Sequence, residues 1–200
     1  MIPTTPASNA CARRCGIGAG VIIVILALVV AASFAFGQGN TGTANERATE
    51  GFRAMHQSLR THINHMIAMA GQLPKQPAEE QKTTMDEIVT CLTDNIHSHA
   101  RVEEEVLYPV VDQAAGTTGE FLFTATMRYE HRIVGRWITE LRNNANQPTP
   151  DVTAFARRTD NLLGLVTAHF EEEEDILLPV LDAKMTVAQF KKEVLDKMEE

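Results

Sequence analysis

A stretch of fourteen residues occurs twice in this chain, and it constrains the fold more than any other feature. The copies read HARVEEEVLYPVVD at 99–112 and HFEEEEDILLPVLD at 169–182. Their shared residues at fixed offsets indicate a duplicated supersecondary unit. Each copy has a glutamate four residues after its histidine, as His99 and Glu103, and as His169 and Glu173. On a helix such residues share one face, about 5–6 Å apart at Cβ, so each copy directs an imidazole and a carboxylate to one place.

Prolines, glycines and capping residues divide the chain after residue 45 into four long helices and a short fifth. The sequence predicts helices from a cap at Thr43 to about 73, from about 77 to 108, from about 120 to 144, from a Thr149-Pro150-Asp151 start to about 178, and from Thr186 onward. The prolines at 109 and 179 are expected to end or kink their helices. Short connections between long helices favour an all-α, up-down-up-down four-helix bundle. In the fifth helix, apolar residues share one side: Val187, Phe190, Val194 and Met198.

The first 45 residues have a different composition. Residues 1–15 form a weakly basic tail that contains Arg13 and Arg14. Residues 16–37 run without a charge, which is long enough to cross a bilayer and also resembles a signal peptide. We favour an uncleaved transmembrane anchor, followed by a linker at 38–45 and the bundle at 46–200. The arginines are expected to stay inside, so the bundle would lie on the extracytoplasmic side; the alternative is an exported soluble protein after cleavage.

Charge excludes some classes of partner. The whole chain carries −8, and residues 1–42 contribute +2 from two arginines and no acid, which leaves −10 on residues 43–200. A body that acidic is a poor partner for nucleic acid or for an anionic membrane surface. The three cysteines include no pair of the zinc-binding type.

The repeat also selects among the other histidines, because it predicts that the first and third helices correspond. The third helix has one histidine, His131, and apolar residues follow it three, seven and ten positions later. In the first helix only His56 reproduces that pattern. His62 falls on the edge of the apolar stripe and His65 well off it, so both are expected at the rim or surface. In the second helix the repeat favours His99 over His97.

The carboxylates sort in the same way. Glu104 and Glu174 lie five residues after the histidines and point about 140° away from them, so the acidic run at 171–174 is expected to be mainly a solvated face. The bundle interior is then expected to hold six polar groups: His56, His99, Glu103, His131, His169 and Glu173. Six such groups in an apolar core are costly unless they are satisfied. A hydrogen-bonded network would do this without metal, but we favour metal ligation, because buried charges are normally paired or bound to metal.

Nitrogen and oxygen donors without thiolate suit iron or manganese, and also zinc. Six ligands are too many for one tetrahedral zinc site. They fit two ions bridged by the carboxylates, with positions left for water, a bridging oxide or a small ligand. Such an open, redox-active pair inside an apolar bundle is what the chemistry of O₂, NO or peroxide requires.

At these residues the chain resembles the hemerythrin-like, or HHE cation-binding, family. The resemblance covers roughly residues 45–183 and rests on His56, His99-x-x-x-Glu103-Glu104, Glu130-His131 and His169-x-x-x-Glu173-Glu174. It implies a four-helix bundle that contains a non-haem di-iron centre, with two Fe²⁺ or Fe³⁺ ions that can be oxo- or hydroxo-bridged. Tyr129 and Glu130, beside His131, are candidates to support the ligands.

One position departs from the family's oxygen carriers. Those proteins have a second histidine one turn after the ligand of the third helix, and here that residue is Gly135. A five-histidine carrier site is therefore not supported, and glycine leaves room for water, substrate or a side chain such as His62 or Tyr129. The pattern is more similar to the sensing, iron-handling, NO-responsive or peroxide-active members.

We therefore expect a membrane-tethered di-iron protein that binds or senses O₂ or NO, or handles iron. The first alternative is a di-iron enzyme that acts on peroxide or repairs oxidatively or nitrosatively damaged iron centres, although no catalytic residue stands out beyond the ligands. The second is an interaction bundle without metal. The expected partners are a small ligand and, through the N-terminal segment, a membrane; nothing in the sequence identifies a protein partner.

Overall fold

The computed structural model describes residues 47–199, which form helices and connecting loops without a strand. The first helix is α3 (Glu50–Gln72), extended by the short turn η1 (Leu73–Lys75). The second is a continuous run of α4 (Ala78–Cys91), η2 (Leu92–His97), α5 (Ser98–Val102), η3 (Glu103–Leu107) and α6 (Tyr108–Ala115). The third is α7 (Ala125–Ala145). The fourth joins α8 (Val152–Glu172), η4 (Glu173–Leu177) and α9 (Leu178–Asp182). A short fifth follows as α10 (Val187–Phe190), η5 (Lys191–Leu195) and α11 (Asp196–Met198).

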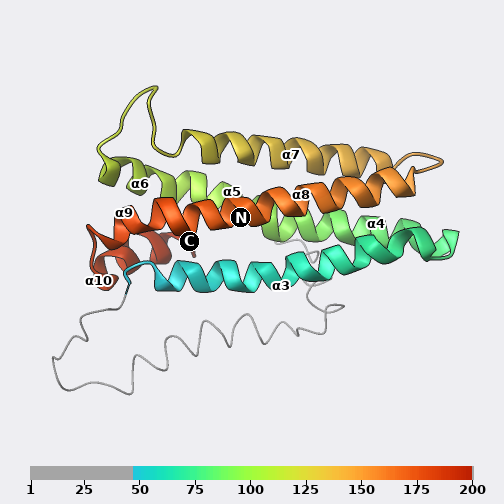
Figure 1. The fold of residues 1–200 in the computed structure, drawn as a ribbon, viewed down its shortest axis with the longest axis horizontal. Coiled ribbons are helices and arrows are strands. Elements are labelled where there is room, and N and C mark those ends of the chain that lie inside the picture. Colours follow the sequence, from blue (N-terminus) through green and yellow to red (C-terminus); the bar gives the residue numbers. More distant parts are fainter. Residues whose placement is uncertain (1–46, 200) are drawn as a thin grey trace, which may run out of the picture. The chain divides into compact units, whose positions relative to one another are not determined.

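The four long helices lie side by side, and each runs back along the one before it in the chain (Figure 1). The expected all-helical bundle with a short C-terminal helix is therefore confirmed for this part of the chain. The predicted tail at 1–15, anchor or signal at 16–37 and linker at 38–45 lie outside the described residues, as does the proposed cap at Thr43. Within residues 47–199, no helix combines the length and apolarity needed to cross a bilayer.

The prolines of the repeat do not end their helices, so the predicted ends near residues 108 and 178 are wrong. A proline lacks an N–H donor and clashes with the carbonyl four residues earlier in a regular α-helix. Each proline lies two residues after the end of a wider π-helical turn, η3 before Pro109 and η4 before Pro179, so the regular α-helical bond pattern is already interrupted there. The helices then continue to Ala115, where Gly116 caps the end at φ 75°, and to Asp182.

Helix starts were predicted less accurately than helices themselves. The fourth helix is capped by Asp151, whose side chain accepts a hydrogen bond from the Ala154 N–H at 2.9 Å, and not by Thr149. The third begins at Ala125 rather than near 120. Thr186 does open the fifth helix, where it forms a reciprocal capping box with Gln189.

The fifth helix packs its apolar side on the bundle with one exception. Phe190 and Val194 are fully buried, and Met198 packs against the same core. Val187, which was expected on that side, is 41% exposed. Val187 is the first residue of this helix, directly after the cap Thr186, where the helix starts to approach the bundle.

The last aspartate of each repeat copy binds the start of another helix through hydrogen bonds, and we call this contact a latch. The Asp182 carboxylate accepts hydrogen bonds at 2.9 Å from the backbone N–H and the hydroxyl of Thr49, just before α3. The Asp112 carboxylate receives the same two bonds at 2.9 Å from Thr124, just before α7. In each case an aspartate from another helix satisfies an end that its own cap residue leaves open. His56 and His131 each lie seven residues after their threonine, which confirms that the two helices correspond.

Candidate metal centre

The six predicted ligands meet in the bundle interior. His56 comes from α3, His99 from α5, Glu103 from the start of η3, His131 from α7, His169 from α8 and Glu173 from the start of η4. Each has at most 9% of its surface exposed, and both glutamates are completely buried. The donor atoms of five of them fall into two groups in which all atoms lie within 4.8 Å of one another: His56, His99 and Glu103, and then Glu103, His131 and His169. Glu173 belongs to neither group.

Glu103 is the member common to both groups. Its Oε1 atom lies 2.8 Å from Nε2 of His99 and 3.4 Å from Nε2 of His56. Its Oε2 atom lies 3.3 Å from Nε2 of His131. One carboxylate therefore reaches imidazoles from three different helices, which is the geometry required of a group that bridges two cations.

Glu173 is placed differently, although it is the equivalent residue of the repeat. Its Oε2 atom lies 3.4 Å from Nε2 of His56 and 3.7 Å from Nε2 of His169. Its Oε1 atom accepts a hydrogen bond of 2.7 Å from the hydroxyl of Tyr108. The carboxylate of Glu173 thus also lies between the two groups, but one of its oxygen atoms already accepts the hydrogen bond from Tyr108.

Several inward atoms are left without a hydrogen bond within the described part of the chain. They are Nε2 of His99, Oε2 of Glu103 and Oε2 of Glu173, all shielded from solvent; each has a nitrogen or oxygen atom nearby, but none forms a hydrogen bond of suitable geometry. An unsatisfied buried polar atom costs about 1–3 kcal/mol. The Nε2 atoms of His131 and His169 also face each other at 2.9 Å. A cation would satisfy these nitrogen and oxygen atoms together, so the cluster fits a metal site.

Carboxylates outside the cluster hold the opposite side of the rings. Nδ1 of His56 lies 3.0 Å from Oε1 of Glu174, and Nδ1 of His131 lies 3.1 Å from Oε1 of Glu104. The prediction that these two glutamates belong simply to the solvated face is therefore wrong. Each points away from the histidine of its own helix, as expected, but in doing so it reaches the histidine of a neighbouring helix.

Glu130 completes this outer set. Its Oε2 atom lies 2.7 Å from Nδ1 of His169, so it supports a ligand of another helix, as its place beside His131 suggested. A carboxylate on Nδ1 keeps the proton there and leaves Nε2 as a free donor for metal. Three of the four imidazoles are fixed in this way with Nε2 directed inward.

Burial and neighbouring charge separate the two inner glutamates. Burial alone would raise the pKa of Glu103, but the imidazoles of His99, His131 and His56 hold that pKa well below its usual range. Burial and then the charge of Glu103 raise the pKa of Glu173 well above its usual range, against the hydrogen bond from Tyr108. Without metal, Glu103 is therefore the ionised member and Glu173 the protonated one. Burial also lowers the pKa of His56, which favours the neutral ring that metal binding needs.

Tyr108 is a site residue that sequence reasoning missed. It is fully buried, and besides Glu173 its hydroxyl lies 3.1 Å from Nε2 of His131 and 3.3 Å from Nε2 of His169. Burial, then the neighbouring carboxyl groups of Glu173 and Glu103, raise its pKa, so the hydroxyl keeps its proton. The repeat could have pointed to Tyr108, because the second copy has Leu178 at the equivalent position and the two residues are chemically different.

The space beside Gly135 is not used as expected. A Cβ atom there would lie 3.5 Å from Nε2 of His97, so neither His62 nor Tyr129 fills it. Tyr129 is 54% exposed, and its ring packs under the Arg132 guanidinium. His62 is buried rather than at the surface, but it belongs to neither ligand group.

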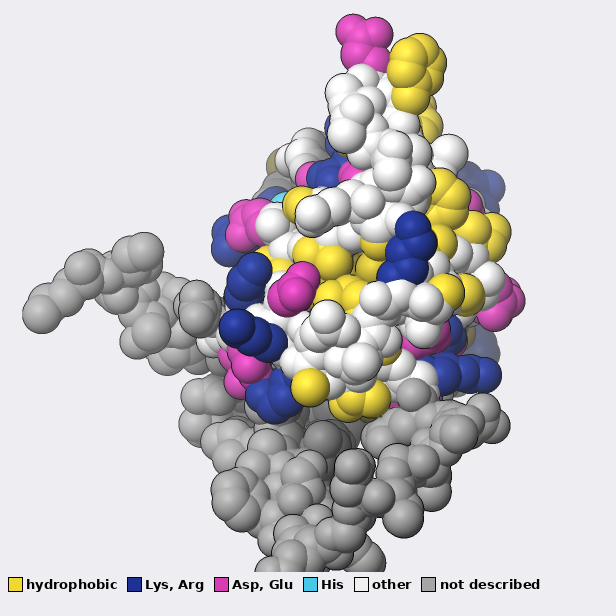
Figure 2. Space-filling model, turned by 90° about the vertical axis from the view of Figure 1, so that its left-hand side faces the viewer, with side chains coloured by type: hydrophobic (Ala, Val, Ile, Leu, Met, Phe, Trp, Pro, Cys, Tyr) yellow, Lys and Arg dark blue, Asp and Glu magenta, His cyan; other side chains and the backbone are white. Residues whose placement is uncertain are grey.

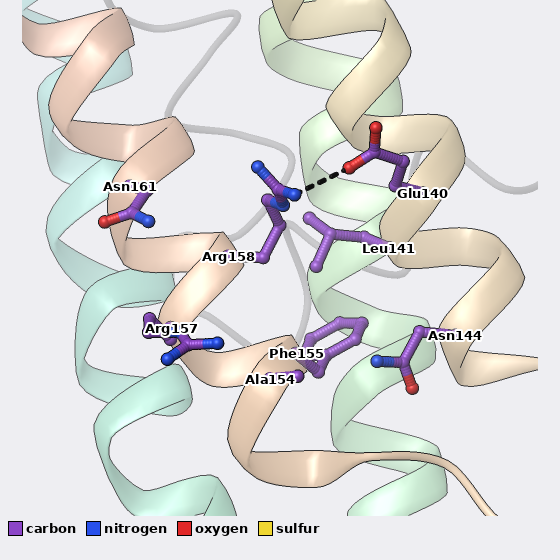
Figure 3. Close-up of a pocket in the computed structure, with 8 residues that line it drawn as sticks. All are labelled: Glu140, Leu141, Asn144, Ala154, Phe155, Arg157, Arg158 and Asn161. Atoms are coloured by element: carbon purple, nitrogen blue, oxygen red, sulfur yellow. Dashed lines mark ion pairs between the residues drawn. The ribbon is translucent and has the colours of Figure 1, made fainter.

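A separate hollow is lined by residues of α7 and α8. It has a volume of about 440 Å³ and is lined by Asn144, Phe155, Arg157 and neighbouring residues (Figure 3). Across it, the Arg158 guanidinium pairs with Glu140 at 3.0 Å. None of the six predicted ligands lines it, so the hollow is distinct from the candidate metal centre.

Comparison with known proteins agrees with this geometry. Residues 47–181 match the family model described as the hemerythrin HHE cation binding domain. No curated protein and no solved structure matches the chain. The matched segment spans all six residues of the cluster, from His56 to Glu173.

Proposed function

The chain belongs to the hemerythrin HHE cation-binding family, and we propose that its bundle holds two non-haem iron ions and binds or senses O₂ or NO. The observation that carries the proposal is Glu103, which is shared between two groups of buried donors. One group would hold the first ion through His56 and His99, and the other would hold the second through His131 and His169. Glu103 and Glu173 would lie between the ions.

The donor set is compatible with iron, and the family supports this choice. Four imidazoles and two carboxylates without thiolate suit a redox-active ion with open positions. Iron, when bound, would supply reversible binding of a diatomic ligand and one-electron chemistry. A carriage role is weaker, because Gly135 stands where oxygen carriers have a fifth histidine.

The surrounding residues prepare the site for such a ligand. Phe52 and Phe170 pack against the rings of His56 and His99 and exclude water from them. The outer carboxylates orient the imidazoles. The hydroxyl of Tyr108 points into the cluster, where it can donate a hydrogen bond. In our proposal the bundle lies on the extracytoplasmic side of a membrane, tethered by residues 16–37.

Metal content and the visible spectrum test this function. The full chain would be purified in detergent, loaded with Fe²⁺ without oxygen and then exposed to air or NO. We expect two irons per chain and the absorption bands of an oxo-bridged pair, with altered bands under NO. Less than one iron per chain after loading, without such bands, would contradict the proposal. Zinc and manganese loading serve as the comparison for metal identity.

A second candidate is an enzyme that acts on peroxide, and the hydroxyl of Tyr108 is the observation that favours it. A protonated hydroxyl among the ligands can supply a hydrogen bond or a proton to a bound oxygen species. Reduced, iron-loaded protein would be mixed with peroxide, first in equal amount and then in excess. Repeated turnover that falls in Tyr108→Phe supports the enzyme, whereas one stable adduct supports the binding protein.

A further inference from the structure

The loop between α6 and α7, residues 116–124, exposes large apolar side chains. Phe121 has 84% of its surface exposed and Phe123 has 38%. Phe121 stands apart even among the exposed hydrophobic residues of the described chain, since the next is Tyr129 at 54%. Single exposed apolar residues are normal on a protein surface, but two phenyl rings on one projecting loop mark a contact site.

The base of this loop is fixed by hydrogen bonds. The Thr117 hydroxyl accepts a bond from the Phe123 N–H at 3.0 Å, and the Thr117 N–H donates to the Asp112 carbonyl at 2.9 Å. Asp112 also holds Thr124, where α7 approaches. Gly116 and Gly119 adopt φ values of 75° and 71°, which glycine accepts without strain where the loop turns. The phenyl group of Phe121 is therefore presented by an ordered loop.

The loop projects from the end of the bundle where the described chain begins. The start of α3, the C-terminal end of α6, α9 and α10 meet at this end (Figure 1). Asp182 joins α9 to the start of α3, and the Lys184 ammonium donates to the Ala114 carbonyl of α6. Seen end on, this face has a protrusion tipped by an apolar and an acidic side chain, with further apolar side chains below it (Figure 2).

The chain that leads to this end has a membrane-type sequence. Residues 16–37 contain no charge, and only nine residues, 38–46, separate them from Arg47. Nine extended residues reach at most about 30 Å. If residues 16–37 cross a bilayer, the end of the bundle that carries Arg47 is held within that distance of the surface.

We propose that this end of the bundle faces the bilayer and that Phe121 and Phe123 insert into its interfacial layer. The partner is the neutral, zwitterionic phospholipid surface. Phenyl side chains bind such a layer through buried apolar area. Acidic and basic side chains are mixed on this face, so attraction to anionic lipid is not the driving force (Figure 2). The contact rests on the membrane tether of the proposed function, but not on whether the cluster binds metal.

Fluorescence quenching in nanodiscs tests the contact. The full chain would be reconstituted in phosphatidylcholine whose acyl chains carry bromine, in a Trp137→Phe background. One variant carries Phe121→Trp, and the matched control carries Gln147→Trp in the exposed turn at the other end of the bundle. We expect the first tryptophan to be quenched several-fold more strongly by bromine than the control, and the control more strongly by aqueous iodide.

Three results would overturn the proposal. The first is that the chain with residues 16–37 does not incorporate into bilayers. The second is that the two tryptophans respond alike to both quenchers. The third is that bromine fails to quench the tryptophan at position 121 while native membranes still protect it from iodide, which would indicate a protein partner instead. Phe123→Trp, in the same background, provides a second reporter and is expected to show weaker bromine quenching than Phe121→Trp, because its side chain is less exposed.

Discussion

The half of the site around His56 and His99 is walled by aromatic rings. The Phe170 ring stacks on His56 with ring centres 4.1 Å apart and an angle of 10°, and the Phe52 ring stacks on His99 at 5.7 Å. Behind His56, the Glu174 carboxylate is held by Arg60 at 2.7 Å. We call this the first half. Aromatic rings line it, and the guanidinium of Arg60 fixes its supporting carboxylate.

The second half, around His131 and His169, keeps the ligands but changes their surroundings. Ala100 is the repeat equivalent of Phe170, Tyr108 that of Leu178, and Gly135 that of Arg60. The Glu104 side chain is 38% exposed against 21% for Glu174, and within the described residues no arginine pairs with its carboxylate.

This difference teaches how a duplicated site becomes asymmetric. Both halves keep the same ligand types and the aspartates that satisfy the helix ends, whereas the residues around the ligands differ. Under the proposed function, two cations would need both sets of ligands, but only one half would have to admit a small molecule. We therefore expect ligand entry and metal exchange to favour the second half, which has a hydroxyl, a small residue in place of a ring and a looser support.

The largest difference is expected between the two inner glutamates. Glu103→Gln removes the one ionised group that three imidazoles surround, so we expect both cations to be lost and the metal-free protein to lose about 3–5 kcal/mol of unfolding free energy. Glu173→Gln also weakens metal binding, but it replaces a group that is already protonated, so metal-free stability should change by about 1 kcal/mol or less. Elemental analysis and urea unfolding in chelator measure both. Equal losses of stability would contradict the assigned charge states.

The same pair has a signed pH dependence. The folded-state pKa of Glu173 is raised above 4.5, so its contribution to stability is present at low pH and is lost as pH rises through the folded value. His56 has the opposite sign, because its lowered pKa costs stability as pH falls below 6.5, but it acts in both proteins. The stability of metal-free Glu173→Gln relative to wild type should therefore increase with pH above 4.5. A flat difference would show that Glu173 ionises normally.

The next effect concerns the supporting carboxylates. Removing a partner of a ligating histidine typically costs about 10–100-fold in metal affinity. We expect Glu174→Gln to approach the upper value, since Glu174 is less exposed and held by Arg60, and Glu104→Gln the lower. Competition with a chromophoric chelator measures each affinity. Arg60→Met is the matched variant: it should reproduce part of the Glu174→Gln loss, and an affinity equal to wild type would remove Arg60 from the account.

A smaller effect is expected from the hydroxyl that distinguishes the halves. Tyr108→Phe leaves Glu173 without its donor, at a cost of about 1–3 kcal/mol in metal-free stability. It should also shift the visible spectrum of the iron-loaded protein. Leu178→Met, at the equivalent position of the first half, is the control and should cost less than about 1.5 kcal/mol. A spectral shift of the same size in both variants would argue against a special role for Tyr108.

The smallest effect is expected from the two aspartates that hold the helix starts, and it should be the same for both. Asp182→Ala and Asp112→Ala each remove a latch at the start of a helix, worth about 1 kcal/mol. Because the two aspartates have the same threonine and arginine contacts, their costs in thermal unfolding should be similar, and metal content should stay unchanged. Unequal costs would show that the asymmetry of the site extends to the helix ends.

Much of this architecture could be predicted from the sequence. Apolar periodicity and the repeat identified the helices and paired His56 with His131, because both signals follow from the helical period. The helix ends were less predictable, since the turns before Pro109 and Pro179 depend on a π-helical conformation that no local pattern announces. Residues 1–45 and the ligand roles of the six residues remain predictions.

The outer contacts could not be found in the same way. A helical projection shows that Glu104 and Glu174 point away from their own histidines, but it contains no neighbouring helix for them to reach. Tyr108 looked like an ordinary core aromatic residue. Only packing of the helices reveals that its hydroxyl meets ligands from α7 and α8.

The central claim is that two cations lie in this bundle, one in each half, with Glu103 between them. Crystals of the iron-loaded protein, measured on both sides of the iron absorption edge, test it directly. We predict two anomalous peaks per chain, one beside His56 and His99 and one beside His131 and His169. A single peak, or none in fully loaded crystals, would contradict the account.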